Sequence, residues 1–292
     1  TWEWNGDAWF LRPESGPSPR WGHGMAFDIA RGITVLFGGY SNQNDYSNET
    51  WEWDGSAWTL RATSGPSARQ NFAMAYDSNR NVIVIFGGTS GRNETWQWNG
   101  SSWVKASSAG PSSRQGARMA YDAHRDRIIL YGGSTSDPNI YNAETWEWNG
   151  STWTRRLPQS PPVMHHAMTY DSARHLIVLF GGSTRVGTTD TAVGETWEWN
   201  NQGWHLTPNT GPSARQHHAM AYDKSREVTV LFGGLVSDGS ASRETWEYDG
   251  TTWLLKSTGG PSARYQHAMT YDSARGVVVL FGGSNDGNET WE

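Results

Sequence analysis

The stretch ETWEWNGSTW, from Glu144 to Trp153, holds three tryptophans in ten residues and decides the fold. Other copies of it begin at Thr1, Glu49, Glu94, Glu195, Glu244 and Glu289. The first tryptophan of each copy lies 45 to 51 residues after the previous one, which gives six complete periods. Periods of this length are typical of repeat architectures, in which each copy forms one structural unit that packs on the next.

Each period is predicted to contain four short strands, here called a to d. Strand a follows a Gly-Pro-Ser turn, and strand b is an apolar run closed by two glycines, as in Val277–Gly283. Strand c is the ETWEW segment, and strand d follows an Asn-Gly or Asp-Gly turn. No segment has sustained helical periodicity. The sequence therefore predicts an all-β fold, a six-bladed β-propeller of four-stranded antiparallel blades.

These motifs resemble the kelch repeat family, in its bacterial-type, tryptophan-rich form. The shared residues are an Arg with a His three positions later (Arg264, His267), a double glycine (Gly282, Gly283), and an aromatic-Asp pair before a Trp (Tyr248, Asp249, Trp253). The resemblance covers the whole chain, with the Trp-x-Trp of strand c as a departure from the usual single Tyr. It implies the propeller fold but does not define one function.

The chain is expected to form a single domain, 1–292, whose ring is closed by strands from both termini. It starts with strands c and d and ends after strands a and b, so one blade takes strands from both ends and leaves no open sheet edge. The N-terminal copy of strand c, rather than Asn288–Glu292, is expected to fill that blade. The predicted blades are 14–61, 62–106, 107–156, 157–207, 208–256, and 257–292 together with 1–13.

Composition excludes several classes of protein. The net charge of −6 argues against a protein whose main task is to bind nucleic acid or an anionic membrane. No apolar run is long enough for membrane insertion, and no signal peptide precedes the first repeat. The absence of cysteine excludes disulfides and thiolate chemistry. The absence of cysteine does not determine the redox compartment, but many secreted bacterial-type domains also lack it, and we expect an extracellular or periplasmic location. We also expect the chain to be a monomer.

The six copies differ most in length between strands b and c. These loops hold five to twelve residues, whereas the rest of each period is nearly constant at 39 or 40. They are Tyr40–Asn48, Thr89–Asn93, Ser134–Ala143, Ser183–Gly194, Leu235–Arg243 and Ser284–Asn288. Because strands alternate in direction, the b–c and d–a connections share one face of the ring. Variable loops on a rigid frame often carry binding function, although surface loops also drift in length without one.

The start of strand a is expected to reach the same face, at the mouth of the central channel. The candidate ligand-binding residues there are Trp21, Gln70, Asn71, Gln115, Met164, His165, Gln216, His217, Tyr265 and Gln266, with the turn arginines Arg20, Arg69, Arg114, Arg215 and Arg264. Amides, imidazoles and aromatic rings suit a sugar or a short peptide. Trp21 is the one tryptophan of 19 that lies outside the repeat pattern. We expect it either to contact a ligand or to fill the mouth of the channel.

Two of these groups have structural alternatives. The arginines could bind an anion, or each could pair with one of the repeated strand c glutamates or with a carbonyl and so stabilise its blade. Those glutamates are Glu49, Glu94, Glu144, Glu195, Glu244 and Glu289. His165 and His217 could approach each other across neighbouring blades, but the repeats supply no carboxylate beside them. We therefore predict no metal and no other cofactor.

We predict a non-enzymatic recognition or scaffold module that binds a glycan or a peptide of a partner protein. No Gly-x-Ser-x-Gly motif is present, so no catalytic residue is assigned. Kelch-like relatives include copper radical oxidases, whose Cys–Tyr crosslink cannot form here, and sialic-acid mutarotases. The first alternative is therefore a mutarotase-like or epimerase-like enzyme that uses the central channel, with His165, His217 or a turn arginine as the acid or base. The second alternative is a purely structural or engineered repeat scaffold.

The tryptophans of the opening stretch are interpreted as packing between blades. A two-residue turn at Asn149-Gly150 would place Trp146 opposite Trp153, with Trp148 on the same face of the hairpin. Because this pattern recurs in all six copies, the tryptophans are expected to stabilise the ring rather than to bind a ligand.

Overall fold

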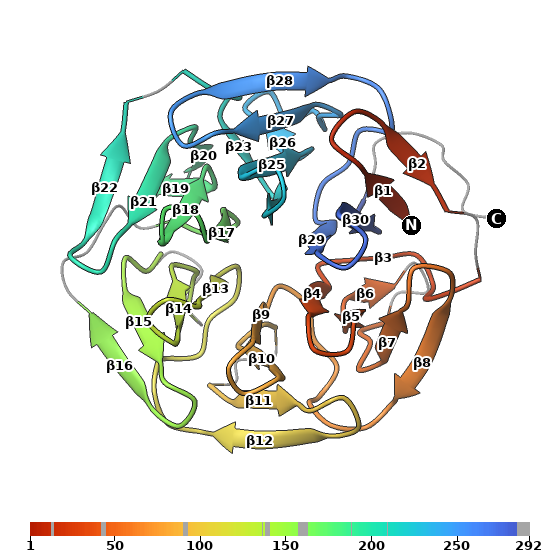
Figure 1. Cartoon of the computed structure of the whole chain (residues 1–292). Helices are drawn as coiled ribbons and strands as arrows, with labels where there is room; N and C mark the ends of the chain where they lie inside the picture. The colour runs from red at the N-terminus through yellow and green to blue at the C-terminus, as the bar shows by residue number, and fades with distance from the viewer. Residues whose placement is uncertain are drawn as a thin grey trace.

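The computed structural model is a six-bladed β-propeller around a central channel (Figure 1), as the sequence predicts. It describes residues 1–12, 15–41, 45–89, 93–135, 137, 141–156, 163–187, 189–208 and 210–284. The described residues contain no helix, and hence none of the length and apolarity that a membrane crossing requires. The strands that line the channel, strands a, are β4 (Gly24–Asp28), β9 (Ala73–Asp77), β13 (Arg118–Asp122), β17 (Ala167–Asp171), β24 (Ala219–Asp223) and β29 (Ala268–Asp272).

The other strands follow outward in the predicted order. Strands b are β5 (Ile33–Phe37), β10 (Val82–Phe86), β14 (Arg127–Tyr131), β18 (Leu176–Phe180), β25 (Val228–Phe232) and β30 (Val277–Phe281). Strands c are β7 (Thr50–Trp53), β11 (Thr95–Trp98), β15 (Thr145–Trp148), β21 (Thr196–Trp199), β27 (Thr245–Tyr248) and β1 (Trp2–Trp4). Strands d are β8 (Trp58–Ala62), β12 (Trp103–Ser107), β16 (Trp153–Arg156), β22 (Trp204–Thr207), β28 (Trp253–Ser257) and β2 (Trp9–Leu11).

The two ends of the chain share one blade. Its sheet has the order β2-β1-β30-β29, with Trp4 opposite Val278 and Trp2 opposite Leu280. The N-terminal copy of the motif therefore fills strand c, and the predicted ring closure is confirmed. The C-terminal copy, with Glu289 and Trp291, lies outside the described residues.

The predicted register of the outer hairpin is wrong, because the turn has four residues instead of two. Trp153 pairs with Trp148, not with Trp146, which lies opposite Arg155. The turn has four residues, because Asn149 Oδ1 accepts hydrogen bonds from the main-chain N–H groups of Ser151 and Thr152. The indole rings of Trp148 and Trp153 lie 5.3 Å apart between centroids, and Trp146 is only half-buried.

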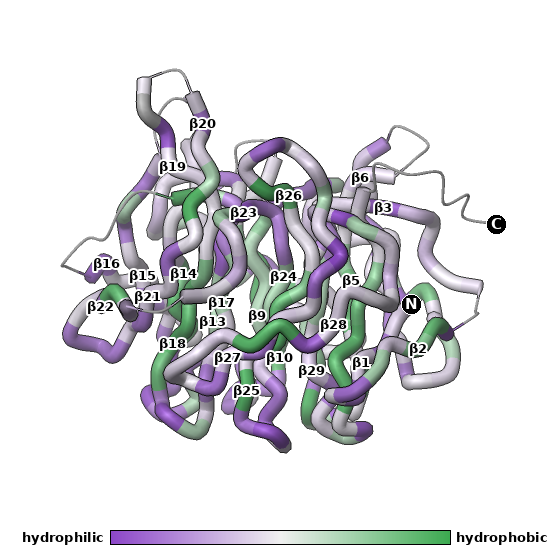
Figure 2. Tube along the Cα trace, turned by 90° about the horizontal axis from the view of Figure 1, so that it is seen from above, coloured by the Kyte–Doolittle hydropathy of each residue, from purple (hydrophilic) through white to green (hydrophobic). Residues whose placement is uncertain are grey.

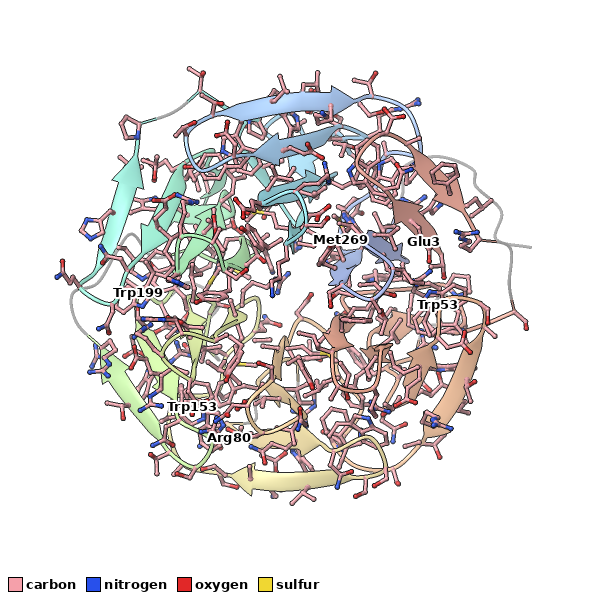
Figure 3. All side chains as sticks on the ribbon, viewed as in Figure 1. Glu3, Trp53, Arg80, Trp153, Trp199 and Met269 are labelled. Carbon is pink, nitrogen blue, oxygen red and sulfur yellow. The ribbon has the colours of Figure 1, made fainter. Side chains whose placement is uncertain are left out.

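The strand d tryptophans join each blade to the one before it. The Trp103 ring packs on Phe37 of the preceding blade, 4.9 Å away, and its Nε1–H donates to Thr50 Oγ1 at 2.8 Å. The same bond recurs at 2.8–3.0 Å around the ring, from Trp9 to Thr245, Trp58 to Thr1, Trp153 to Thr95, Trp204 to Thr145 and Trp253 to Thr196. Figure 3 shows Trp53, Trp153 and Trp199 in the outer part of the blades, away from Met269 beside the channel. The geometry matches the predicted packing role.

The two faces of the ring differ. The loop face, defined by the b–c loops and d–a connections, carries short additional sheets, whereas the turn face carries the a–b and c–d turns. The additional strands are β3 (Arg20–Trp21) with β6 (Tyr40–Ser41), β23 (Arg215–Gln216) with β26 (Leu235–Val236), and the hairpin of β19 (Ser183–Val186) and β20 (Thr189–Ala192). Figure 2 shows the hairpin projecting furthest from this face.

Candidate functional site

A closed ring of main-chain hydrogen bonds narrows the channel at its loop-face end. Its members lie two positions after the turn arginine, or after Val163 at the equivalent position of the fourth blade. The N–H of each member donates to the carbonyl of its counterpart in the preceding blade. The six bonds, at 2.8–3.0 Å, run from Gly22 to Gln266, Asn71 to Gly22, Gly116 to Asn71, His165 to Gly116, His217 to His165 and Gln266 to His217. All six residues have φ between +55° and +69°, the left-handed region. The channel is therefore narrowed at this end by main-chain atoms as well as by side chains.

The structure brings four of the candidate ligand-binding residues together in this ring. The His165 and His217 rings stack with centroids 3.8 Å apart, as expected for imidazoles that meet across neighbouring blades. Asn71 and Gln266 instead line a cavity inside the channel. Among the described residues no group of three or more His, Cys, Asp or Glu could hold a metal ion.

The residue before each ring member pairs with the start of a b–c loop. Trp21 pairs with Tyr40, and Gln216 pairs with Leu235. Gln115, Met164 and Tyr265 pair in the same way with Ser134, Ser183 and Ser284, and the N–H of Gln70 donates to Thr89 Oγ1. These six candidates are therefore spread around the channel mouth at the base of the loops, and only Met164 is buried.

The turn arginines form hydrogen bonds and ion pairs within their own blades, which is the structural alternative to binding an anion. They are buried, between 0% and 2% exposed, and each donates from Nη1 to the first carbonyl of its double glycine. Their Nη2 atoms contact the strand c glutamate of the same blade, at 2.6 Å for Arg20–Glu49, 3.5 Å for Arg69–Glu94, 2.7 Å for Arg114–Glu144 and 2.6 Å for Arg215–Glu244. In the blade of Arg264, strand c is β1, and this copy of the motif begins at Thr1, the position that follows the glutamate in the other copies. These guanidiniums brace their own blades and are not presented to a ligand.

Trp21 belongs to an aromatic cluster on the loop face, here defined as Trp21, Tyr40 and Tyr46. The Trp21 and Tyr40 rings lie 5.1 Å apart between centroids, and those of Tyr40 and Tyr46 lie 5.0 Å apart. Trp21 and Tyr40 are half-buried, and Tyr46 is 41% exposed. Sequence reasoning found Trp21 but missed the tyrosines, although both lie in the first b–c loop that it singled out.

The histidines of the channel are held neutral. Burial, together with the nearby charge of Arg118, lowers the pKa of His217 to about 3. The pKa of His165 is held well below its usual value by burial and by the electrostatic effects of His217 and Arg118. An imidazole of such low pKa is a weak general base near neutral pH. His165 and His217 are therefore poorly suited to act as the base of a mutarotase-like reaction.

Two cavities lie along the channel, and the sequence did not predict them. A cavity of about 110 Å³ lies below the hydrogen-bond ring, and a wider funnel of about 440 Å³ is lined at its far end by residues of the a–b turns on the turn face. Both are lined by the same six methionines, Met25, Met74, Met119, Met168, Met220 and Met269. The methionine ring therefore separates a small inner chamber from the open funnel. The signal was an Ala-Met or similar pair in every strand a.

The repeat, the blade order and the ring closure define a six-bladed propeller of the kelch type. Residues 93–292 match the family model of the Attractin/LZTR1 beta-propeller, and this match covers more than half of the chain. The chain belongs to that family. No curated protein matches it significantly.

Proposed function

We propose that the chain is a non-enzymatic recognition module that binds a peptide segment of a partner protein on its loop face. The observation that carries this proposal is the half-exposed aromatic cluster of Trp21, Tyr40 and Tyr46, which departs from the repeat and belongs to a variable loop. Family membership supports a protein-interaction role, because propellers of this kind serve as interaction scaffolds.

The asymmetry of the loop face supports this choice of surface. The cluster lies on the first blade, beside the short sheet of β3 and β6, and the β19–β20 hairpin rises from the fourth blade (Figure 2). By contrast, the turn face repeats the same Asp-Arg turn around the ring, as in Asp28–Arg31 and Asp272–Arg275. A surface that differs from blade to blade can recognise one orientation of a ligand, whereas a six-fold surface cannot.

A peptide suits the cluster for a physical reason. Aromatic side chains bury a large area at a small cost in side-chain entropy, and Trp and Tyr dominate the binding free energy of many protein interfaces. The same rings could stack on a sugar, so a glycan remains the second ligand class to be tested. The purely structural scaffold is the outcome in which neither class binds.

The test compares peptide and glycan arrays probed with the wild-type chain and with the Tyr46→Ala and Trp21→Ala variants. We expect peptide hits, followed by a loss of affinity of about tenfold or more in each variant, because each truncation removes an aromatic anchor worth roughly 2 kcal/mol. Affinities are measured by isothermal titration calorimetry on the best peptide.

The matched control is Leu254→Ala on the outer strand β28, which removes a side chain that is 60% exposed and far from the channel. Its affinity should equal that of the wild type. Binding that survives both aromatic truncations, or an absence of hits on both arrays, would contradict the proposal.

A further inference from the structure

Arg118 breaks the repeat at a position where every other blade has a residue without a long side chain. It is the first residue of strand β13, and the equivalent residues are Gly24, Ala73, Ala167, Ala219 and Ala268. A small residue is expected here because the innermost strands crowd around the channel. An arginine at one of six equivalent positions therefore places a single long, charged side chain inside the channel.

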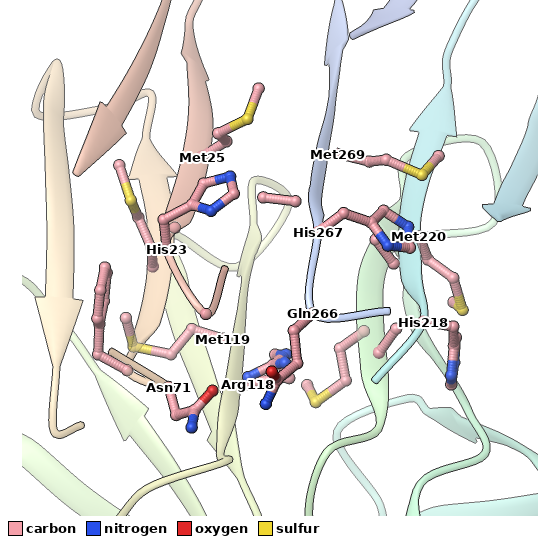
Figure 4. Close-up of a pocket in the computed structure, with 18 residues that line it drawn as sticks. His23, Met25, Asn71, Arg118, Met119, His218, Met220, Gln266, His267 and Met269 are labelled. Atoms are coloured by element: carbon pink, nitrogen blue, oxygen red, sulfur yellow. The ribbon is translucent and has the colours of Figure 1, made fainter. Parts of the chain in front are cut away.

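The side chain of Arg118 lines the inner chamber above the methionine ring. Figure 4 shows it together with Asn71 and Gln266 at the end of the chamber away from Met25 and Met269. One end of the chamber thus carries a guanidinium and two amides, whereas the other holds Met25 and Met269 beside the imidazoles of His23 and His267. A volume of about 110 Å³ has room for several waters or for one small organic ion.

The charge of Arg118 has no counter-charge in the described part of the chain. Its one hydrogen bond there runs from Nη1 to the carbonyl of Ala117 at 3.1 Å, and no ion pair to a carboxylate is present among those residues. Many arginines elsewhere in the described part of the propeller are paired with carboxylates, as Arg31 is with Asp28 and Glu52. Burial lowers the pKa of Arg118 to about 10, so it still carries its charge at neutral pH. The Arg118 side chain is half-buried at the channel. A charge that is partly withdrawn from water and has no counter-charge nearby favours the binding of an anion.

The imidazoles near Arg118 cannot supply the missing charge. His165, His166, His217 and His218 all have a pKa held below its usual value, first by burial and also by the charge of Arg118. They are neutral around it, and a neutral imidazole can share a hydrogen bond but cannot balance a cation. The chamber is therefore electrostatically suited to an anion.

We propose that the inner chamber is a binding site for a small organic carboxylate. Arg118 would hold the carboxylate through the paired N–H groups of its guanidinium, and the amides of Asn71 and Gln266 would supply further donors. A short alkyl tail would lie among Met119, Met269 and the other methionines, whose flexible thioethers adapt to varied shapes. Because these methionines also line the funnel, a ligand could enter from the turn face.

The test measures the binding of acetate, butyrate and chloride at constant ionic strength, by calorimetry and by the shift in melting temperature. The wild-type chain should bind butyrate more tightly than acetate and show no specific effect of chloride. Arg118→Ala should weaken butyrate binding roughly 100-fold, as expected for the loss of a bidentate charge-assisted contact. Its melting temperature should no longer respond to either carboxylate.

Arg118→Ala installs the residue that four other blades carry, so the variant should fold. Without added ligand it should be at least as stable as the wild type, because it removes a half-buried charge that has no counter-charge among the described residues. The control is Lys224→Ala, which removes a charge of the same sign from the lining of the funnel and should leave the affinity for butyrate within about twofold.

Three results would overturn the proposal. They are no binding of either carboxylate to the wild type, equal effects of chloride and butyrate, and unchanged butyrate affinity in Arg118→Ala. None of them bears on peptide binding at the loop face, which involves other residues.

Discussion

Lowering the pH from 7 to 5 is expected to unfold the propeller, because six of its histidines are kept from protonation in the folded state. Burial lowers the pKa of His23 and His217 to about 3, and the pKa of the others lies well below the usual value. The full set is His23, His165, His166, His217, His218 and His267. In the unfolded chain each imidazole regains an ordinary pKa near 6.5.

The sign of the effect follows from these pKa values. Above pH 6.5 the histidines are neutral in both states and stability does not depend on them. Below that value the unfolded chain takes up protons that the folded chain cannot, and each histidine then costs about 1.4 kcal/mol of unfolding free energy per pH unit. Six groups together cost on the order of 12 kcal/mol by pH 5, relative to the stability at high pH, which is comparable with the whole stability of an ordinary domain. The melting temperature measured from pH 8 to pH 4.5 should therefore fall steeply below about pH 6.

His23→Phe is the informative variant, because the second blade already has Phe72 at the equivalent position. There the Phe72 ring packs on Phe37, just as the His23 ring packs on Phe281. This variant should reduce the pH slope by one proton, whereas His205→Phe, at an exposed position on β22, should leave it unchanged. A melting temperature that stays constant down to pH 5 would contradict the neutral, buried state of these side chains.

Trp103→Ala is expected to destabilise the ring by about 3–5 kcal/mol, the usual cost of truncating a buried Trp. The residue is 9% exposed, its ring contacts Phe37 and Trp98, and its loss would leave Thr50 Oγ1 without the indole donor. The free energy of unfolding is obtained from urea titration followed by circular dichroism.

The neighbouring residue provides the control. Val104 lies next along β12 with its side chain 54% exposed, so Val104→Ala should change the stability by about 0.5 kcal/mol or less. Similar losses in the two variants would show that Trp103 does not join the blades in the way described. Trp146→Ala should cost less than Trp103→Ala, since Trp146 is half-buried and donates within its own blade, to Glu144 Oε2.

The fold could be predicted because the same strand and turn motifs recur in six copies of the repeat. The double glycines, the apolar b strands and the tryptophans of strand c recur with one spacing, and the loop lengths show which segments lie outside the frame. The register of the outer hairpin could not be predicted from the sequence in this way. Asn149-Gly150 is compatible with a two-residue turn, and only the contacts of the Asn149 side chain with Ser151 and Thr152 select the four-residue turn.

The candidate site was predictable in place but not in detail. Four of the candidate residues do meet at the channel, namely Asn71, His165, His217 and Gln266. Their positive φ values and their ring of main-chain hydrogen bonds depend on all six blades being in position. Comparison of the copies did contain two unused signals. One is Arg118 among small residues. The other is Gln97, which stands where the other blades have a glutamate between the two aromatic residues of strand c, as Glu52. Arg31 pairs with Glu52, whereas Arg80 pairs with Asp126 of the next blade at 2.6 Å.

The most direct test of the recognition surface is hydrogen–deuterium exchange with and without the best peptide from the arrays. The account predicts that bound peptide slows exchange on the loop face, at the amides of Trp21, Tyr40–Ser41, Tyr46 and Leu235–Val236. Exchange at the a–b turns around the funnel, such as Ile29 and Lys224, should not change. Protection confined to those turns, with the aromatic cluster unaffected, would contradict the assignment of the binding surface to the loop face.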